Sequence, residues 1–388
     1  SQTGYFFERL SHEEALDKLL EISDYRALCA ERDALRKQGI HRGLGLCAFI
    51  ELTTPGPAFY GVGGARISSQ DGCTIKFEPS GTLTCMTGVT EQGQGTDTMI
   101  AQVVASAVGV AMEDVRVLTG DTMVSPYGGG TWASRGAGIG GEAALQTGKA
   151  IRANILNVAA AILECEPEDL DIRLGKIVDA LTGEVRLDLA ELGRVAYFRP
   201  DTLPKDFQAE LTVTRHYVPR HQGFAFTNGI QLSHVEVDVE TGFVRLLKHW
   251  CVEDCGRIIN PRLVDEQIRG AIVQGIGAAL YEHLVYDEQG QLLTGTMMDY
   301  LVPMAAEMPE IVVGHVETPT AYAEGGFKGA GEAGTAGAPG AVLNAVNDAL
   351  APFGARVTSQ PITPEVVLKA LGQLGSGLEI QHQASAGD

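Results

Sequence analysis

The chain alternates between stretches in which apolar residues recur at helical spacing and shorter apolar runs that are typical of strands. The helical spacing predicts four long helices, over residues 10–37, 99–110, about 141–165 and 263–282. The first helix should break near Ser23 and Asp24, and Ser11 with Glu14 makes a candidate capping box at its start. The short runs predict a buried strand over 43–52, paired strands over 73–78 and 83–88, and a hairpin over 233–257.

We divide these elements into two modules of similar size, residues 1–200 and 201–375, with residues 376–388 as a tail. Within the first module, the stretch from about residue 166 predicts a small αβ insertion. It contains short strands near Ile172 and Ile177, a Thr-Gly turn and a short helix.

The most unusual stretch is Gly-rich, runs over residues 325–340 and reads GGFKGAGEAGTAGAPG. Glycines at this density leave backbone amides open to close approach by a ligand. Lys328 and Glu332 are its only charged residues, so Glu332 is a candidate acid or base. Pro339 precedes an apolar run with helical spacing, and it predicts the first turn of a helix that points at the loop.

An alternative interpretation of this stretch is a dinucleotide site, because Gly329 to Gly334 match the pattern GxGxxG. That pattern requires a strand directly before it and a helix directly after it. Residues 320–328 make a poor strand, and Pro339 delays the predicted helix. A nicotinamide-dependent dehydrogenase that uses GAGEAG as its nucleotide loop is therefore the weaker alternative.

A second loop, over residues 88–98, leads from a strand into the helix at 99–110, and Thr96 or Asp97 is a candidate cap for that helix. Open amides at a helix start suit an anion, and the Gln94 side chain offers both a donor and an acceptor. The alternative is an ordinary capped turn between a strand and a helix.

A third loop, over residues 120–136, carries Thr131, Ser134 and Arg135 just before the helix at 141–165. Hydroxyls, a guanidinium group and open amides are the groups that bind a phosphate ester. In the alternative interpretation, Arg135 only caps the loop.

The helix over 263–282 places Gln267 and Gln274 two turns apart, on one face. Glycines at 270, 275 and 277 lie nearby, so two amides on an open face indicate a hydrogen-bonded heterocycle. A helix crossing mediated by these glycines is the alternative.

Composition narrows the class of partner more than the class of reaction. The formal net charge is −20, which argues against nucleic acid and anionic membranes. The seven cysteines form neither a CxxC motif nor a disulfide framework, which predicts reduced thiols and a cytoplasmic location. The sequence shows no signal peptide, no apolar run long enough for a membrane span, and no His cluster with metal-ligand spacing.

Five motifs occur in an order that resembles the molybdenum hydroxylases, the large-subunit family of xanthine dehydrogenase, aldehyde oxidase and carbon monoxide dehydrogenase. They are EQGQG, PYGGGTWASRG, DCGRIINP with QIRGAIVQGIGAALYE, MDYLVP, and KGAGEAGTAGAP. The similarity covers nearly the whole chain. It implies an α+β fold of two mixed modules with the cofactor at their interface.

The resemblance also implies roles for individual residues. Glu332 matches the family's general base, and the family's metal is held by the dithiolene of molybdopterin and not by protein side chains. The cofactor-binding positions that match are Gln94, Gly95, Thr131, Ala133, Ser134, Arg135, Gln267, Gln274 and Gly331. The implied activity is oxidation of an aldehyde or an N-heterocycle at an electron-poor carbon, with oxygen derived from water. The resemblance leaves open whether the pterin carries a cytosine dinucleotide.

The chain also departs from the family pattern. A complete large subunit is about twice this length, and its first half carries a Gly-Gly-Phe-Gly loop, whereas Gly130 is followed here by Thr131. Phe327 stands where a small residue is common. We therefore expect a C-terminal half, completed by a second molybdopterin-binding chain, with [2Fe–2S] clusters and FAD on further partner chains. A catalytically inactive cofactor-binding or scaffold paralogue is the alternative.

Overall fold

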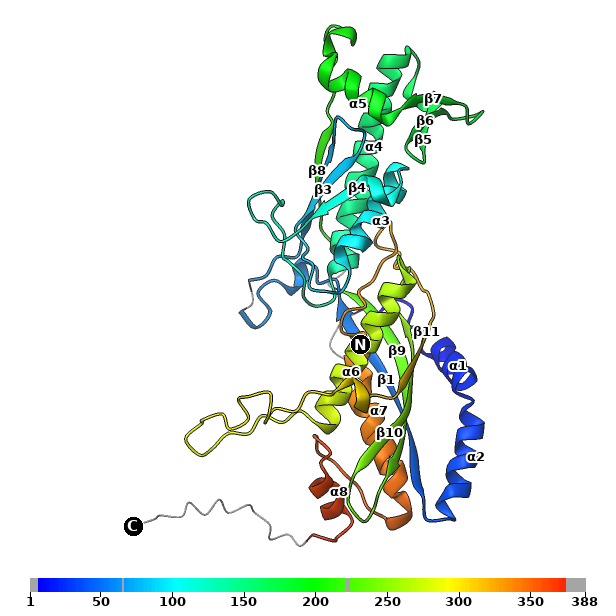
Figure 1. The fold of residues 1–388 in the computed structure, drawn as a ribbon, viewed down its shortest axis with the longest axis vertical. Coiled ribbons are helices and arrows are strands. Elements are labelled where there is room, and N and C mark those ends of the chain that lie inside the picture. The colour runs from blue at the N-terminus through cyan, green and yellow to red at the C-terminus, as the bar shows by residue number, and fades with distance from the viewer. Residues whose placement is uncertain (1–5, 65, 221–223, 375–388) are drawn as a thin grey trace.

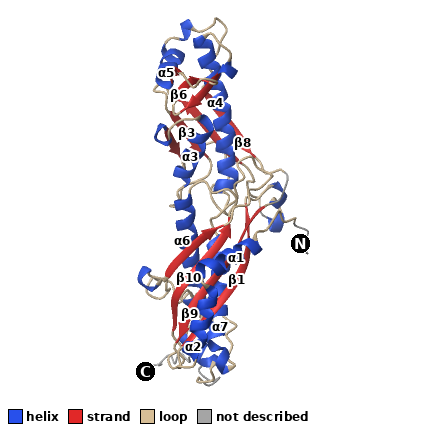
Figure 2. Ribbon diagram, turned by 90° about the vertical axis from the view of Figure 1, so that its right-hand side faces the viewer, coloured by secondary structure: helices blue, strands red, loops and turns tan. Residues whose placement is uncertain are grey.

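The fold is built on two four-stranded sheets that stand end to end along an elongated molecule (Figures 1 and 2). It was obtained as a computed structural model, which describes residues 6–64, 66–220 and 224–374. One sheet has the strand order β1-β9-β10-β11 and the other β4-β3-β2-β8. Helices pack on both sheets, so the predicted α+β class with two mixed modules is confirmed. The predicted tail, residues 376–388, lies outside the described residues.

The lower lobe in Figure 1 contains the first sheet between two layers of helices. Its strands are β1 (His41–Thr53), β9 (Ala225–Val237), β10 (Val244–Asp254) and β11 (Glu310–His315). Its helices are α1 (His12–Ser23), α2 (Tyr25–Arg36), α6 (Pro261–Leu280), α7 (Ala333–Leu350) and α8 (Pro364–Ala370). Leu232 and Trp250 are buried on the side of α1, whereas Phe49 and Val235 are buried on the side of α6 and α7. The sheet is thus covered on both faces.

The upper lobe contains the second sheet and the insertion. Its strands are β2 (Asp71–Phe77), β3 (Leu83–Thr87), β4 (Val115–Leu118) and β8 (Thr212–Tyr217), and its long helices are α3 (Thr96–Val108) and α4 (Glu142–Leu163). The predicted insertion forms a third sheet of β5 (Leu170–Arg173), β6 (Lys176–Asp179) and β7 (Val185–Asp188), followed by α5 (Leu189–Phe198).

The two sheets do not follow the division predicted at residue 200. The chain makes β1 in the lower lobe, crosses to the upper lobe for β2 to β8, and returns for β9. β1 and β9 then pair along 13 residues each, from His41 opposite Val237 to Thr53 opposite Ala225. The boundary was predicted from segments that are adjacent in the sequence. Such a prediction misses the pairing of β1 with β9, because these two strands lie far apart in the sequence.

Two glycines of β1 bring that strand unusually close to α7. A Cβ atom on Gly43 would lie 1.9 Å from the carbonyl oxygen of Ala345, and one on Gly45 would lie 2.1 Å from that of Ala341. Only residues without a side chain allow this approach of backbone to backbone. Since alternate residues of a strand share a face, the later residues of β1 on this face lead toward the start of α7.

The local predictions at two helix starts are wrong. Ser11 does not cap α1 through its side chain, because its hydroxyl donates to the carboxylate of Asp254 at 2.6 Å. α7 begins at Ala333, so Pro339 lies inside the helix and not in its first turn. Packing of this Ala- and Gly-rich stretch against β1 and α6 outweighs the unfavourable helix propensity of proline.

Candidate functional site

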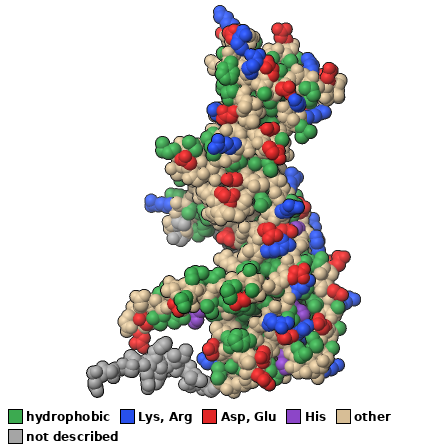
Figure 3. All heavy atoms as spheres, in the orientation of Figure 1, with side chains coloured by type: hydrophobic (Ala, Val, Ile, Leu, Met, Phe, Trp, Pro, Cys, Tyr) green, Lys and Arg blue, Asp and Glu red, His purple; other side chains and the backbone are tan. Residues whose placement is uncertain are grey.

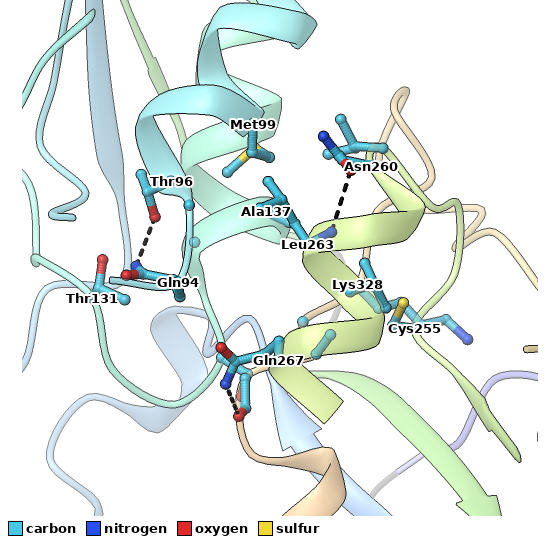
Figure 4. A pocket seen from close by; sticks show the side chains of 18 of the residues that line it. Gln94, Thr96, Met99, Thr131, Ala137, Cys255, Asn260, Leu263, Gln267 and Lys328 are labelled. Atoms are coloured by element: carbon cyan, nitrogen blue, oxygen red, sulfur yellow. Dashed lines mark hydrogen bonds between the residues drawn. The ribbon is translucent and has the colours of Figure 1, made fainter. Parts of the chain in front are cut away.

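A cavity of about 270 Å³ lies where the two lobes meet, and segments distant in the sequence form its walls (Figure 4). The loop before α3 and the loop over residues 131–137 come from the upper lobe, and α6 and the Gly-rich loop come from the lower lobe. Of the predicted site residues, those that line the cavity are Gln94, Gly95, Thr131, Ala133, Ser134, Gln267, Gly331 and Glu332. The fold therefore brings most of the predicted residues together.

The loop before α3 is organised by Glu91, which the sequence analysis did not select. Its carboxylate accepts hydrogen bonds from the backbone N–H groups of Gly93 at 2.7 Å, Gly95 at 3.1 Å and Asp97 at 3.0 Å. Burial acts to raise the pKa of Glu91, but these N–H groups outweigh burial and lower it. The amides predicted to be open to an anion are occupied, and neither Thr96 nor Asp97 caps the helix through its side chain.

Gln94 and Thr131 are fixed on the cavity wall by a small hydrogen-bond network. The Gln94 amide nitrogen donates to the Thr96 hydroxyl at 2.7 Å, as Figure 4 shows, and to the carbonyl of Thr90 at 3.0 Å. The Thr131 hydroxyl donates to the same carbonyl at 2.8 Å and accepts from the Thr90 N–H group at 2.9 Å. The network ties the loops at 90–96 and at 131 into one wall.

Glu332 occupies the N-cap position of α7, at the end of the Gly-rich loop. Its carboxylate accepts a hydrogen bond from the Ser134 hydroxyl at 2.7 Å, and its backbone N–H donates to the same hydroxyl at 3.0 Å. Ser134 and its neighbour Ala133 both have positive φ angles, 48° and 46°, which cost free energy in residues other than glycine. The loops from the two lobes are thus held together at this serine.

A second carboxyl group, Glu51 of β1, also contacts the Ser134 hydroxyl. Glu51 is 8% exposed, and burial together with the negative charge of Glu332 raises its pKa to about 8. The sequence analysis missed this residue. Its signal was present, because an acidic residue inside a strand predicted to be buried needs a specific partner.

The rest of the Gly-rich loop is held by its backbone. The N–H group of Gly329 donates to the Thr53 hydroxyl at 3.2 Å, and its carbonyl accepts from the Thr227 hydroxyl at 2.5 Å. The Gln267 amide nitrogen donates to the carbonyl of Gly331 at 2.7 Å, as drawn in Figure 4. β1, β9 and α6 therefore each fix one part of the loop that ends at Glu332.

Two predicted residues lie outside the cavity wall. Gln274 is exposed on α6 and does not line the cavity, although Gln267, two turns earlier, does. The Arg135 guanidinium group is completely buried and bonds to the Asp71 carboxylate at 2.8 Å and to the carbonyl of Gln70 at 2.7 Å. This placement agrees with the alternative in which Arg135 organises its own loop.

The geometry around GAGEAG does not make a dinucleotide site. Within the described part of the chain, the last strand before the motif, β11, ends at His315, and Phe327 forms only an isolated bridge with Gly256. α7 begins at Ala333, almost at the end of the motif. The strand, loop and helix of the fingerprint are therefore not all present.

The chain was compared with families, proteins and structures. Residues 18–309 match the family model of the molybdopterin cofactor-binding domain. The nicotine 6-hydroxylase large subunit of Paenarthrobacter nicotinovorans is 38% identical, over 95% of this chain and 45% of its own length. The carbon monoxide dehydrogenase large chain of Hydrogenophaga pseudoflava is 32% identical, over 96% and 46%.

Among solved structures, quinoline 2-oxidoreductase from Pseudomonas putida 86 superposes with a TM-score of 0.85 at 34% identity. That match covers 96% of this chain and 48% of the other. The chain thus spans about half the length of the relatives it matches. On these matches, which agree with the motif order and with the cavity between the lobes, the chain belongs to the large-subunit family of the molybdenum hydroxylases, in its molybdopterin cofactor-binding domain.

Proposed function

We propose that this chain is the molybdopterin-binding part of a catalytic molybdenum hydroxylase that oxidises an N-heteroaromatic substrate at an electron-poor carbon. The observation that carries the proposal is the position of Glu332. Its carboxylate is at the cavity wall and is oriented by Ser134, while Gln94 and Gln267 lie on the other walls. A carboxylate held at a cavity wall, where it can reach a bound substrate, is the arrangement that general-base catalysis needs.

The cavity fits molybdopterin by the chemistry of its lining. Gln267 and Asn260 offer amide groups for the polar edge of a pterin, and Met99 and Leu263 offer apolar contacts for its faces. Both N–H groups of the Gln94 amide are already donated within the wall, which leaves its oxygen as an acceptor. Across the described ranges, no group of three or more His, Cys, Asp or Glu side chains is placed to hold a metal ion. From the family resemblance, we propose that the pterin carries the metal. When bound, the cofactor supplies the two-electron oxidation and the site for oxygen derived from water.

The chain's own residues supply orientation and proton transfer. Glu332 acts as the general base and takes up a proton on its carboxylate as the substrate is hydroxylated. Ser134 keeps that carboxylate directed into the cavity, and the bond from Gln267 to Gly331 fixes the loop beside it. A change in the position of either group should reduce the rate more than the binding of substrate.

The substrate class rests on the relatives. Nicotine 6-hydroxylase and quinoline 2-oxidoreductase, by their names, act on nitrogen heterocycles, and they are 38% and 34% identical to this chain. The carbon monoxide dehydrogenase chain is 32% identical, so the sequence identities of the N-heterocycle enzymes exceed that of the carbon monoxide enzyme by only a few per cent. We favour an N-heteroaromatic compound over an aldehyde on this basis.

A long arm over residues 282–304 supports the presence of another polypeptide. It projects from the lower lobe between α6 and β11 and carries hydrophobic side chains on its visible surface (Figures 1 and 3). Met297 and Met298 are 76% and 88% exposed. We propose that the arm is covered by the missing half of the large subunit, as a second chain or as a longer form of this one.

Electron transfer after the oxidation would require acceptors on other chains, for which we propose an iron–sulfur subunit and an FAD subunit. No helix in the described ranges is long and apolar enough to cross a membrane. A cytoplasmic location stays a prediction from the cysteine pattern.

The test is Glu332→Gln in the assembled enzyme, with Glu365→Gln as the matched control. Glu365 is exposed on α8, outside the cavity lining. We expect Glu332→Gln to retain molybdenum and pterin and to lower turnover by roughly two to four orders of magnitude, the range for a general base. Full activity in Glu332→Gln would refute the role of Glu332, and a wild-type complex without molybdopterin would favour the inactive scaffold.

A further inference from the structure

Three groups meet at the Ser134 hydroxyl, and two of them are carboxyl groups. The hydroxyl oxygen contacts Glu51, lies 2.7 Å from the Glu332 carboxylate, and lies 3.0 Å from the Glu332 backbone nitrogen. A serine hydroxyl has one proton to donate and two lone pairs that accept. The backbone N–H group of Glu332 uses one lone pair, which leaves one donor and one acceptor for two carboxyl groups.

This count is satisfied when one carboxyl group carries a proton. If Glu51 is protonated, its O–H donates to Ser134, and Ser134 donates to Glu332. All three contacts are then hydrogen bonds. If both carboxyl groups are ionised, the hydroxyl proton of Ser134 can bond to only one of them. The oxygen of the other carboxylate then faces the hydroxyl oxygen with no proton between them, and this contact is repulsive.

Burial decides which carboxyl group holds the proton. Glu51 is 8% exposed and Glu332 is exposed in this chain, so ionisation costs more at Glu51. The second carboxyl oxygen of Glu51 is buried and has no hydrogen-bond partner, which also disfavours a negative charge there. Glu332 stands at the N-terminus of α7, where the helix dipole favours an anion.

The groups packed around Glu51 offer it no compensating cation. Within the described ranges, the charge that acts most strongly on Glu51 is that of Glu332, which has the same sign. Lys328, on the same loop as Glu332, donates to the Thr318 hydroxyl at 3.1 Å and lies 3.9 Å from Asp254. The next cation along the Ser134 loop, Arg135, is bonded to Asp71.

We propose that Glu51 is a positioning residue that keeps a proton, directs the Ser134 hydroxyl to Glu332, and so holds Glu332 in the orientation of a base. The inference rests on the proposed function of Glu332. It assigns a role to β1, since Glu51 lies opposite Thr227 in the sheet, well away in sequence from both of its partners. The strained Ala133–Ser134 turn places the hydroxyl between the two carboxyl groups.

The chemical step involves protons alone. When Glu332 takes up a proton, the hydrogen bonds reverse: the Glu332 O–H donates to Ser134, and Ser134 donates to the carbonyl oxygen of Glu51, which keeps its own proton on its other oxygen. The proton that Glu332 took up then leaves from Glu332 to water, and the first arrangement returns. No electrons move and no covalent bond to carbon changes in this chain of hydrogen bonds.

The experiment compares wild type, Glu51→Gln and Ser134→Ala in the assembled enzyme. Glutamine is isosteric with a protonated glutamate, and its amide N–H replaces the carboxyl O–H as donor to Ser134. We expect the turnover of the wild type to fall as pH rises through about 8, because Glu51 then loses the proton that it donates to Ser134, and we expect Glu51→Gln to show no such alkaline decline. Ser134→Ala should lower turnover roughly 10- to 100-fold, the range for a lost hydrogen bond to a charged group.

Infrared spectroscopy gives a readout that does not depend on turnover. The wild type should show the carbonyl band of a protonated carboxyl group at about pH 6 and lose it by about pH 10, because the pKa of Glu51 is raised to about 8. The band should be absent from Glu51→Gln at every pH. Thermal melting of each variant checks that it is folded.

The outcomes separate this inference from the proposed function. Suppose that Glu332→Gln is inactive, while wild type and Glu51→Gln show the same dependence of turnover on alkaline pH and the same infrared spectrum. The role of Glu51 is then refuted, and the role of Glu332 stands. An equal loss of activity in Glu51→Gln and Glu332→Gln would also refute it, because Glu51 would then take part in the chemistry directly. If Glu332→Gln is fully active, the proposed function fails first.

Discussion

The protonated carboxyl group of Glu51 should make the free energy of unfolding depend on pH, and Glu51→Gln should remove this contribution. Its pKa rises from 4.5 to about 8 on folding. Between these values the folded state keeps a proton that the unfolded state has lost, so the free energy of unfolding falls as pH rises. The stabilisation is complete below pH 4.5 and is lost as pH rises through about 8.

At about 1.36 kcal/mol for each pKa unit, the full effect is roughly 5 kcal/mol. Between about pH 5.5 and about pH 8.5, the wild type should lose on the order of 3 kcal/mol relative to Glu51→Gln. The assay is denaturant unfolding of both proteins at the two pH values. Groups distant from Glu51 titrate alike in the two proteins, so the pH-dependent change in the difference between their free energies of unfolding reports on Glu51 and its contacts.

Glu365→Gln is the matched control, because Glu365 is exposed on α8 and should give the wild-type response. A difference between wild type and Glu51→Gln that stays constant with pH would show that Glu51 titrates as it does in the unfolded chain. A difference that changes in the opposite direction would show that the folded protein stabilises the ionised form.

Two further predictions concern the packing that supports the site. Gly45→Ala places a Cβ atom 2.1 Å from a carbonyl oxygen of α7 and should lower the free energy of unfolding by about 1–3 kcal/mol in denaturant unfolding. The control Gly270→Ala, in an open position on α6, should be neutral or slightly stabilising in the same assay. Equal effects of the two substitutions would contradict the close contact between β1 and α7. Gln267→Ala removes the bond to the carbonyl of Gly331 and should lower the molybdenum and pterin content of the purified enzyme; unchanged content would argue against its role.

Much of the secondary structure could be predicted because it depends on local patterns. The strand expected over 43–52 is β1, and the helix expected over 141–165 is α4. The break near Ser23 separates α1 from α2, since Asp24 adopts a left-handed conformation there. Glu332, which lines the cavity, could also be selected from the sequence, because a lone carboxylate among glycines has few structural uses.

The arrangement of these elements could not be derived from local patterns. The periodicity of β1 does not show that β9 is its partner, and so the predicted division at residue 200 does not coincide with the composition of the two sheets. The start of α7 was misplaced because proline and glycine have poor helix propensity in isolation, whereas here Pro339 packs against α6 and Gly340 against β1. The resemblance to a family identified the cavity wall in advance, but it gave no information on Glu51, whose partner Ser134 is 83 residues away.

The contact between Ser134 and Glu332 also limits when the site can form. The two residues are separated by 198 positions, so a ribosome that adds roughly 5–20 residues per second reaches Glu332 about 10–40 s after Ser134. β1 likewise emerges long before α7, the helix that covers its glycines. The cofactor pocket can therefore close only after Glu332 and α7 have left the ribosome, so the complete pocket cannot bind its cofactor before that point of synthesis.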